Sequence, residues 1–170
     1  MALGKDYVTQ ECGIARALEI VGERWTLLVL RDAFYGVRRY NDFLTHLGIP
    51  RAVLATRLQA LTDAGVMEKR AGEHGRHEYV LTEAAYGLWP ALHALRVWGR
   101  DLTGSDPVYV FTHAACGTEL GAYGECPECA VPVPPVEVAM RRGSGVPKDP
   151  EHPVNRALEQ PRRLLDPLVV

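Results

Sequence analysis

The sequence predicts a mostly helical α+β fold in which a helical part with one β-hairpin precedes a small β appendage. Apolar residues recur at helical spacing through most of residues 1–104. The strand-like runs VMEKR and HEYVL flank a glycine-bearing connector, AGEHGR. Beyond the turn-forming run TGSDP lie two pairs of metal-ligand residue types, HAAC and CPEC. We therefore expect a main domain at 1–104, a β subdomain at 105–141 and a partly disordered tail at 142–170.

Three short helices are expected before residue 49. In CGIARALEIVG the apolar residues recur at helical spacing, and Gly22 supplies a stop. RWTLLVLRDAFYG is apolar over so wide a face that it predicts a buried helix ending near Gly36. RYNDFLTHLG predicts a third helix that Gly48 closes. These three helices are thus expected to precede residue 49.

The stretch IPRAVLATRLQALTDAG predicts the clearest helix of the chain. Pro50 suits its first turn, and Gly65 suits the position just after its end. Three leucines, at 54, 58 and 61, share one face. A helical wheel places Ala52, Thr56, Gln59 and Asp63 opposite them. This helix therefore has an apolar inner face and a small, polar outer face.

A β-hairpin and a long helix are expected next. VMEKR and HEYVL form the two strands of the hairpin. Thr82 and Glu83 then suit a helix N-terminus, and leucine and tryptophan residues continue at helical spacing to Leu102. Pro90 is expected to kink this helix. Three helices, a hairpin and a helix form the order of a winged helix-turn-helix, in which the second helix of the turn enters the major groove of DNA.

Charge supports a DNA-binding interpretation locally but not overall. The formal net charge is −2, which argues against indiscriminate polyanion binding. Residues 24–57 nevertheless hold six arginines against two aspartates. Phosphate contacts are predicted for basic residues of the turn and the hairpin, namely Arg38, Arg39, Arg51, Arg70 and Arg76, and Arg57 is a further predicted DNA-binding residue. Base contacts are predicted for Ala52, Thr56 and Gln59. Because any surface helix has a polar back, this pattern alone also fits an ordinary exposed helix.

Residues from about 10 to 102 resemble the HxlR-type transcription regulators of bacteria, relatives of the MarR group. The resemblance lies in Gly22 with Trp25, in Arg39 with Tyr40, in the leucine-rich helix ending at Gly65, and in YVLT before the last helix. It implies a homodimeric regulator, usually a repressor, which binds a roughly palindromic operator and dimerises through its terminal helices. Two features depart from the family pattern: Pro50 stands where serine is usual, and the hairpin connector is shorter.

The spacing of residues 113–129 predicts a zinc-ribbon-like structure. Structural zinc takes four nitrogen or sulfur ligands, and His113 with Cys116 and Cys126 with Cys129 would supply two knuckles. A β subdomain of about 35 residues is too small to be stable without a metal ion or a covalent cross-link. Water, Glu125 or Glu128 could replace His113, and a disulfide between Cys126 and Cys129 is the rival interpretation. The glutamate of a deaminase-type zinc site is missing after His113, and no other catalytic motif is present, so no enzyme is predicted.

Regulation is less defined by the sequence. Cys12, before the first helix, occupies the place of the cysteine through which some HxlR-type proteins sense oxidants, although such a cysteine can also be an inert apolar residue. A small-molecule effector is an alternative, with aromatic residues lining its pocket: Trp25, Tyr35, Tyr86, Trp89 and Trp98. The absence of an apolar run of membrane-spanning length or of a secretory signal predicts a cytoplasmic protein. A winged-helix and zinc-ribbon module of the transcription machinery, acting through protein contacts, is the alternative function.

Overall fold

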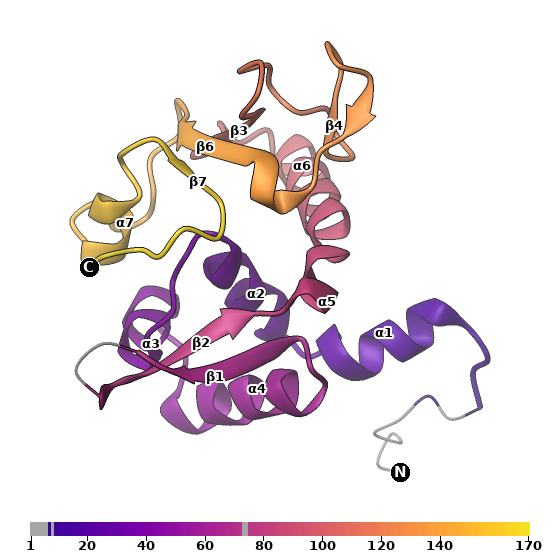
Figure 1. The fold of residues 1–170 in the computed structure, drawn as a ribbon, viewed down its shortest axis with the longest axis vertical. Helices are drawn as coiled ribbons and strands as arrows, with labels where there is room; N and C mark the ends of the chain where they lie inside the picture. The colour runs from indigo at the N-terminus through magenta and orange to yellow at the C-terminus, as the bar shows by residue number, and fades with distance from the viewer. Residues whose placement is uncertain (1–6, 8, 73–74) are drawn as a thin grey trace.

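The computed structural model describes residues 7, 9–72 and 75–170 (Figure 1). The first part contains α1 (Gly13–Val21), α2 (Thr26–Phe34), α3 (Tyr40–Leu47), α4 (Arg51–Asp63), β1 (Met67–Ala71), β2 (His77–Leu81), α5 (Glu83–Tyr86) and α6 (Trp89–Thr103). The second contains β3 (Tyr109–His113), β4 (Glu125–Cys126), β5 (Val131–Pro132), a 3₁₀ turn (Pro135–Glu137), β6 (Val138–Arg142), α7 (Pro153–Ala157) and β7 (Arg162–Arg163). The predicted winged-helix order and the β appendage are both present.

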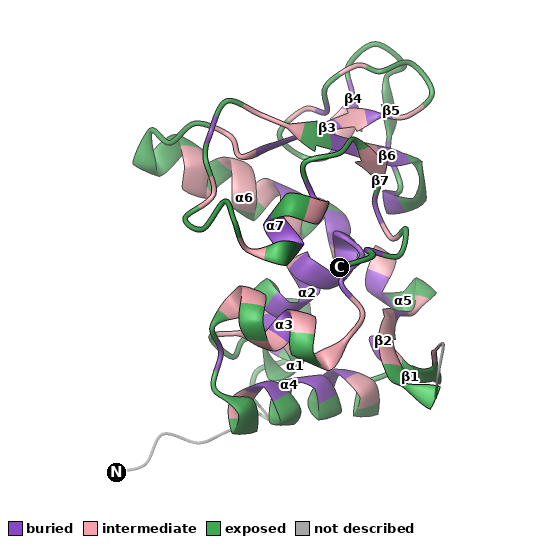
Figure 2. Ribbon diagram, turned by 90° about the vertical axis from the view of Figure 1, so that its left-hand side faces the viewer, coloured by how far each residue is buried: buried purple, intermediate pink, exposed green. Residues whose placement is uncertain are grey.

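The helix-turn-helix consists of α3, a tight turn and α4. Gly48 ends α3 in the left-handed conformation, with φ of 61°, which glycine adopts without steric cost. The three leucines of α4, at 54, 58 and 61, are fully buried. Gly65, with φ of 70°, follows α4 where a helix-ending glycine was expected. The periodicity of the sequence therefore defines this unit correctly, and its polar outer face is exposed (Figure 2).

The wing is the antiparallel hairpin of β1 and β2. Met67 pairs with Leu81 at its base, and Ala71 pairs with His77 near its tip. Residues 73 and 74 of the predicted connector lie outside the described residues. At its base, Thr82 donates from its backbone N–H to the Val66 carbonyl at 3.1 Å, which ties the end of β2 to the end of α4.

The prediction of one long helix between residues 82 and 102 is wrong. The chain forms the short helix α5, breaks at Gly87 and Leu88, and resumes as α6. Pro90 lies in the first turn of α6 rather than in a helix interior. The physical reason is that proline costs little in the first turn, where its missing N–H would have no helical partner. Pro90 therefore begins a helix where a kink was expected.

The β appendage shares its core with the helical part. β3 pairs with β6, β6 pairs with β7, and β4 pairs with β5, all antiparallel. Phe111 of β3 packs edge-on against Trp89 of α6, with ring centroids 5.3 Å apart. His93 of α6 lies 3.0 Å, through Nε2, from the Gly121 carbonyl. Burial and the charge of Arg96 lower the pKa of His93 to about 4, so at neutral pH the ring is uncharged and donates one hydrogen bond.

Residues 142–170, predicted to be partly disordered, contain α7 and β7 and contribute Val154, Leu158 and Leu164 to the buried core. The backbone of this segment hydrogen-bonds to the end of α2: Leu165 N donates to the Phe34 carbonyl at 2.9 Å, and Leu168 N donates to the Gly36 carbonyl at 2.9 Å. A β-carbon at position 36 would collide with the Asp166 carbonyl, so glycine is required there. The sequence gives few signs of this packing because the contacts join residues far apart in the chain.

Two helices expose apolar side chains to solvent. α1 projects from the body of the molecule (Figure 1). It exposes Ile14, Leu18 and Ile20, and α6 exposes Leu95, Trp98 and Leu102. Apolar surface of this kind often marks a protein interface. Among the helices of the described residues, none combines the length and apolar character that crossing a bilayer requires.

Candidate nucleic-acid interface and metal centre

The outer face of α4 presents the residues predicted to contact DNA bases. Ala52, Thr56 and Gln59 are exposed. The Thr56 hydroxyl donates to the Ala52 carbonyl at 2.9 Å, and the Gln59 amide donates to Asp63 Oδ1 at 2.7 Å. The Thr56 hydroxyl oxygen and the Gln59 amide oxygen can still accept hydrogen bonds. The face is therefore polar and exposed.

The predicted phosphate-binding arginines fall into two groups. Arg51 at the start of α4 and Arg70 and Arg76 in the wing are exposed, although Arg70 pairs with Glu68 of the same strand. Arg39 is half-buried at the N-terminus of α3. The structure thus leaves Arg51 and the wing arginines accessible to solvent, although Arg70 also lines the hollow that Arg38 and Leu165 border.

Arg38 and Arg57 make contacts within the protein. Arg38 Nη2 donates to the Leu165 carbonyl at 3.0 Å, and Arg38 Nη1 lies 3.8 Å from Glu78 Oε2. Arg57 Nη1 lies 3.6 Å from Glu23 Oε2. Sequence reasoning missed both partners because Glu23 and Leu165 lie on segments that the helical periodicity does not relate to α3 or α4. Both guanidinium groups are therefore engaged by the fold.

The metal-ligand residues converge at one point in the β appendage. His113 ends β3, Cys116 lies in the following turn, Cys126 is in β4 and Cys129 is in the turn before β5. One ligand atom from each lies within 4.8 Å of all the others. Gly117 adopts a φ of 77° in the first turn, and the Cys129 N–H donates to Cys126 Sγ at 3.4 Å in the second. The two predicted knuckles are therefore formed and face each other.

The separations within this cluster fit a tetrahedral zinc ion. Zinc–sulfur bonds of about 2.3 Å and zinc–nitrogen bonds of about 2.0–2.1 Å place ligand atoms roughly 3.3–3.8 Å apart. Cys116 Sγ lies 3.5 Å from His113 Nδ1, 3.5 Å from Cys126 Sγ and 3.7 Å from Cys129 Sγ. All four described cysteines are free, so the rival disulfide is not formed. The group of four can hold a metal ion.

A carboxylate that the sequence did not single out supports His113. Glu137 Oε2 lies 3.5 Å from His113 Nε2, which leaves Nδ1 toward the cysteines. Such a second contact commonly fixes the ring of a metal-binding histidine. Glu125, an alternative ligand in the sequence, instead accepts from the Tyr123 N–H at 3.0 Å and is not among the four clustered residues. Hydrogen bonds from Thr118 lower the pKa of the Cys116 thiol to about 6, whereas hydrogen bonds with Cys116 and Cys126 raise the pKa of the Cys129 thiol to about 12. Of these two thiols, Cys116 is thus the one that more readily forms a thiolate.

The predicted aromatic pocket is not assembled as expected. Tyr35 and Trp89 line one apolar groove between α2 and α6, of about 280 Å³. Tyr86 lines a different hollow beside the wing, and Trp98 is 64% exposed. Trp25 is half-buried at the start of α2. These five side chains are therefore not brought together in either of these two cavities.

Cys12 lies at the N-terminus of α1, where its sulfur accepts a hydrogen bond from the Ala15 N–H at 3.3 Å. It is exposed, and α1 lies far from the β4 region that carries the clustered cysteines (Figure 1). This position is the one that the sequence predicted. Its role as an oxidant sensor stays a prediction.

The model of the HxlR-like helix-turn-helix family matches residues 20–106, just over half of the chain. This chain belongs to the HxlR-like helix-turn-helix family. The match spans α2 to α6 and includes the complete helix-turn-helix and wing. The protein is accordingly a transcriptional regulator with a helix-turn-helix DNA-binding fold.

Similar proteins agree with this HxlR-like assignment. An uncharacterised HTH-type transcriptional regulator of Mycobacterium tuberculosis is 38% identical over 136 residues, covering 78% of this chain and 86% of that protein. The crystal structure of PA1607, a candidate transcription factor, has a TM-score of 0.52 and 41% identity, covering 54% of this chain and 65% of that one. This chain thus spans just under two thirds of PA1607. A MarR-family regulator from Porphyromonas gingivalis, at 24% identity and a TM-score of 0.50, shares the fold.

Proposed function

We propose that this HxlR-like protein is a homodimeric repressor that binds a roughly palindromic operator through the exposed face of α4. The observation that carries the proposal is the combination of Thr56 and Gln59 on one exposed face of α4 with exposed arginines at the start of that helix and in the adjacent wing. Arginine at the helix start suits a phosphate, while hydroxyl and amide groups one and two turns later suit base edges. The wing arginines would add contacts to the flanking backbone.

Substitutions on α4 should separate affinity from specificity. We expect Arg51→Ala to weaken binding to the DNA upstream of the protein's own gene by about tenfold. The slope of log affinity against log salt concentration should become shallower by roughly one. Gln59→Ala should reduce discrimination against changed base pairs by about 1–3 kcal/mol. Gel shift at several salt concentrations, with specific and scrambled DNA, measures both effects.

Arg163→Ala is the matched control, since Arg163 is exposed on β7, at the opposite end of the molecule from α4 (Figure 1). It should bind DNA as the unchanged protein does. The proposal fails if the unchanged protein shows no specific shift at moderate salt, or if the α4 variants and the control behave alike.

The dimer is proposed from the exposed apolar faces of α1 and α6. Leu102 is 70% exposed and Ile14 is 73% exposed, although both are large apolar side chains. Burying such surface between two copies contributes about 25 cal/mol per Å² before the cost of association. A second protomer also fits a two-fold symmetric operator, because each α4 would then read one half-site.

A charge on α6 should dissociate this dimer. We expect Trp98→Asp to convert a dimer to a monomer at micromolar concentration in size-exclusion chromatography with light scattering. Tyr123→Asp provides the control, since Tyr123 is another largely exposed aromatic residue but lies in the loop before β4 and not on α1 or α6. Equal masses for both variants would argue against an interface on α6.

We further propose that His113, Cys116, Cys126 and Cys129 hold a structural zinc ion. The supporting observations are the ligand separations and the second contact of His113 with Glu137. With four protein ligands the coordination shell is closed, which suits a structural and not a catalytic zinc. The zinc would hold the loops between β3 and β6 in the position that meets α6.

A further inference from the structure

A cavity of about 570 Å³ lies between the winged helix and the C-terminal segment. One wall comes from α2, α3 and α6, and the other from residues 105–109 and 147–155. Its volume falls in the range of small-molecule sites, about 300–1,000 Å³. It is distinct from the groove between α2 and α6, although Arg31, Tyr35 and Arg96 border both.

The cavity contains a cation without a carboxylate partner. Arg31 and Arg100 each pair with an aspartate at 2.7 Å, Asp32 and Asp101 respectively. No such ion pair within 4.0 Å is found for Arg96 among the described residues. Its Nη1 donates a long hydrogen bond, 3.5 Å, to the Tyr109 carbonyl, but its Nε is buried without a hydrogen-bond partner in the described part of the chain. The guanidinium lies 4.6 Å from the centre of the Phe111 ring. A partly buried, unpaired cation is costly, so a bound anion would be stabilised there.

The rest of the lining suits an apolar body attached to that anion. Tyr35 and Tyr109 are buried, with ring centroids 5.6 Å apart in an edge-on arrangement. The Tyr109 hydroxyl is buried and has no partner among the described residues. Burial raises the pKa of Tyr35 to about 12, so this phenol stays neutral beside the arginines. The two acidic residues of the lining, Asp106 and Asp149, are exposed and can turn toward water.

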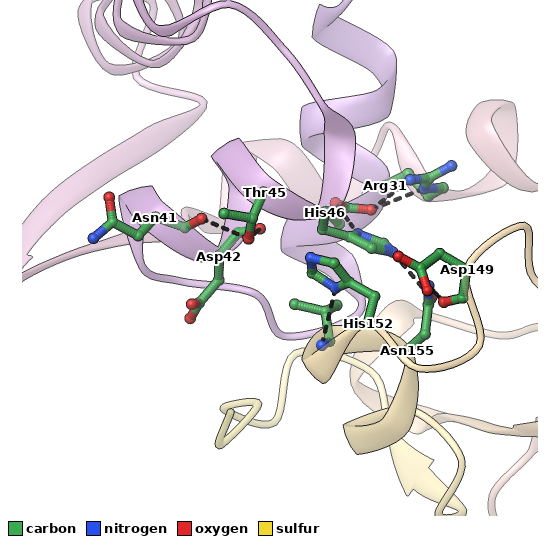
Figure 3. Close-up of polar contacts among 10 residues, drawn as sticks. Arg31, Asn41, Asp42, Thr45, His46, Asp149, His152 and Asn155 are labelled. Atoms are coloured by element: carbon green, nitrogen blue, oxygen red, sulfur yellow. Dashed lines mark hydrogen bonds and ion pairs between the residues drawn. The ribbon is translucent and has the colours of Figure 1, made fainter.

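The cavity wall also connects the helix-turn-helix to the C-terminal segment. His46 of α3 lies 2.7 Å, through Nδ1, from Asp32 Oδ2 and 3.0 Å, through Nε2, from Asn155 Oδ1 of α7 (Figure 3). The Asn155 amide in turn donates to the Asp149 carbonyl at 2.7 Å. His46, Asp149 and Asn155 all border the cavity. A ligand that fills it would therefore touch both α3 and the segment docked on α3.

We propose that this cavity binds a small organic anion, a carboxylate carried on a compact apolar or aromatic body, and that its occupancy changes the affinity of α4 for DNA. Arg96 would take the carboxylate, with Arg31 and Arg100 beside it, and Tyr35 and Tyr109 would take the apolar body. The anion would bind one arrangement of α3 more tightly than another, and the resulting shift in the position of α3 would change how α4 meets DNA. The effect of the anion on DNA affinity rests on the proposed DNA-binding function, while binding of the anion in the cavity does not.

Binding is tested by calorimetry with carboxylic acids from acetate through benzoate to naphthoate, alongside benzyl alcohol and inorganic phosphate. At least one apolar acid should bind more tightly than acetate, phosphate or benzyl alcohol. Arg96→Met should weaken that acid at least tenfold, whereas Arg163→Met should not change it. Thr45→Trp, which fills this cavity and not the groove, should also weaken it. Thermal unfolding of each variant separates this effect from misfolding.

Failure of every acid to bind, equal binding of benzyl alcohol, or preference for phosphate would overturn the binding site. If Thr45→Trp binds the acid as tightly as the unchanged protein does, the acid lies in the groove between α2 and α6, and the proposed cavity site is also overturned. The bound acid should change DNA affinity at least threefold in gel shift. An acid that binds as expected while specific DNA binding stays unchanged would overturn the effect on DNA affinity alone, and absence of specific DNA binding would instead contradict the proposed function.

Discussion

Removing zinc should unfold the β appendage and lower the stability of the whole chain. We expect the purified protein to contain one zinc ion per chain, and Cys126→Ala to lose it, because Cys126 is a fully buried member of the cluster. Structural zinc contributes about 10–16 kcal/mol of apparent binding energy in zinc-finger peptides, so losing several kcal/mol of folding free energy is expected here. Phe111 and Cys126 share one core cluster with Trp89, so the effect should reach α6.

Elemental analysis and thermal unfolding, with and without a chelator, measure this effect. Hydrogen exchange should show faster exchange across residues 109–142 and in α6 after zinc is removed. Cys12→Ala is the matched control, since Cys12 is a free cysteine outside the cluster, and it should keep both zinc and stability. His113→Cys should keep zinc, because a fourth thiolate can replace the imidazole. Less than about half a zinc ion per chain in the unchanged protein would make the four-ligand site untenable.

Asp32→Ala should be among the most destabilising single substitutions in the helical part. Asp32 is fully buried, accepts from Arg31 at 2.7 and 2.9 Å, and lies 2.7 Å from His46. Burial lowers the pKa of Arg31, but the charge and hydrogen bonds of Asp32, together with the nearby Tyr35 and Tyr109, raise this pKa overall. Breaking a buried ion pair from one side costs about 3–5 kcal/mol. Because the Arg31 side chain is 34% exposed, we expect a loss of about 3 kcal/mol.

For a chain of this size that loss corresponds to about 6–12 °C in melting temperature, which calorimetry or circular dichroism can measure. Asp101→Ala is the matched control, since Asp101 also pairs with the arginine before it at 2.7 Å but is exposed. An exposed pair contributes at most about 1 kcal/mol, so the control should melt within a few degrees of the unchanged protein. Equal melting temperatures for the two variants would contradict a structural role for the buried carboxylate.

Local sequence patterns predicted the helix-turn-helix well because its signals lie within one or two helical turns. The buried Leu54, Leu58 and Leu61 and the left-handed Gly48 and Gly65 are features of spacing and of single-residue conformation. The clustering of the four candidate metal ligands was predictable for the same reason, since each knuckle is a local motif. The break before Pro90 was missed because the leucine spacing continues across it.

Features that depend on long-range contacts were not predictable from spacing. The docking of Asn155 against His46 joins residues 109 positions apart, and no periodicity in either segment indicates the other. The partners of Arg38 and Arg57 and the cavity between α3 and α7 likewise require the folded chain. An arginine in a DNA-binding motif therefore cannot be assigned to DNA by its position alone, because the fold itself can use the charge.

The backbone contacts between residues 165–168 and the end of α2 affect how the chain folds while it is being synthesised. Arg38 and Leu165 are 127 residues apart, so at about 5–20 residues per second the ribosome needs about 6–25 seconds to make the second partner after the first. During this interval the carbonyls of Phe34 and Gly36 lack the N–H groups that they later accept from. We expect the nascent winged helix to reach its final stability only when this late segment has emerged and docked.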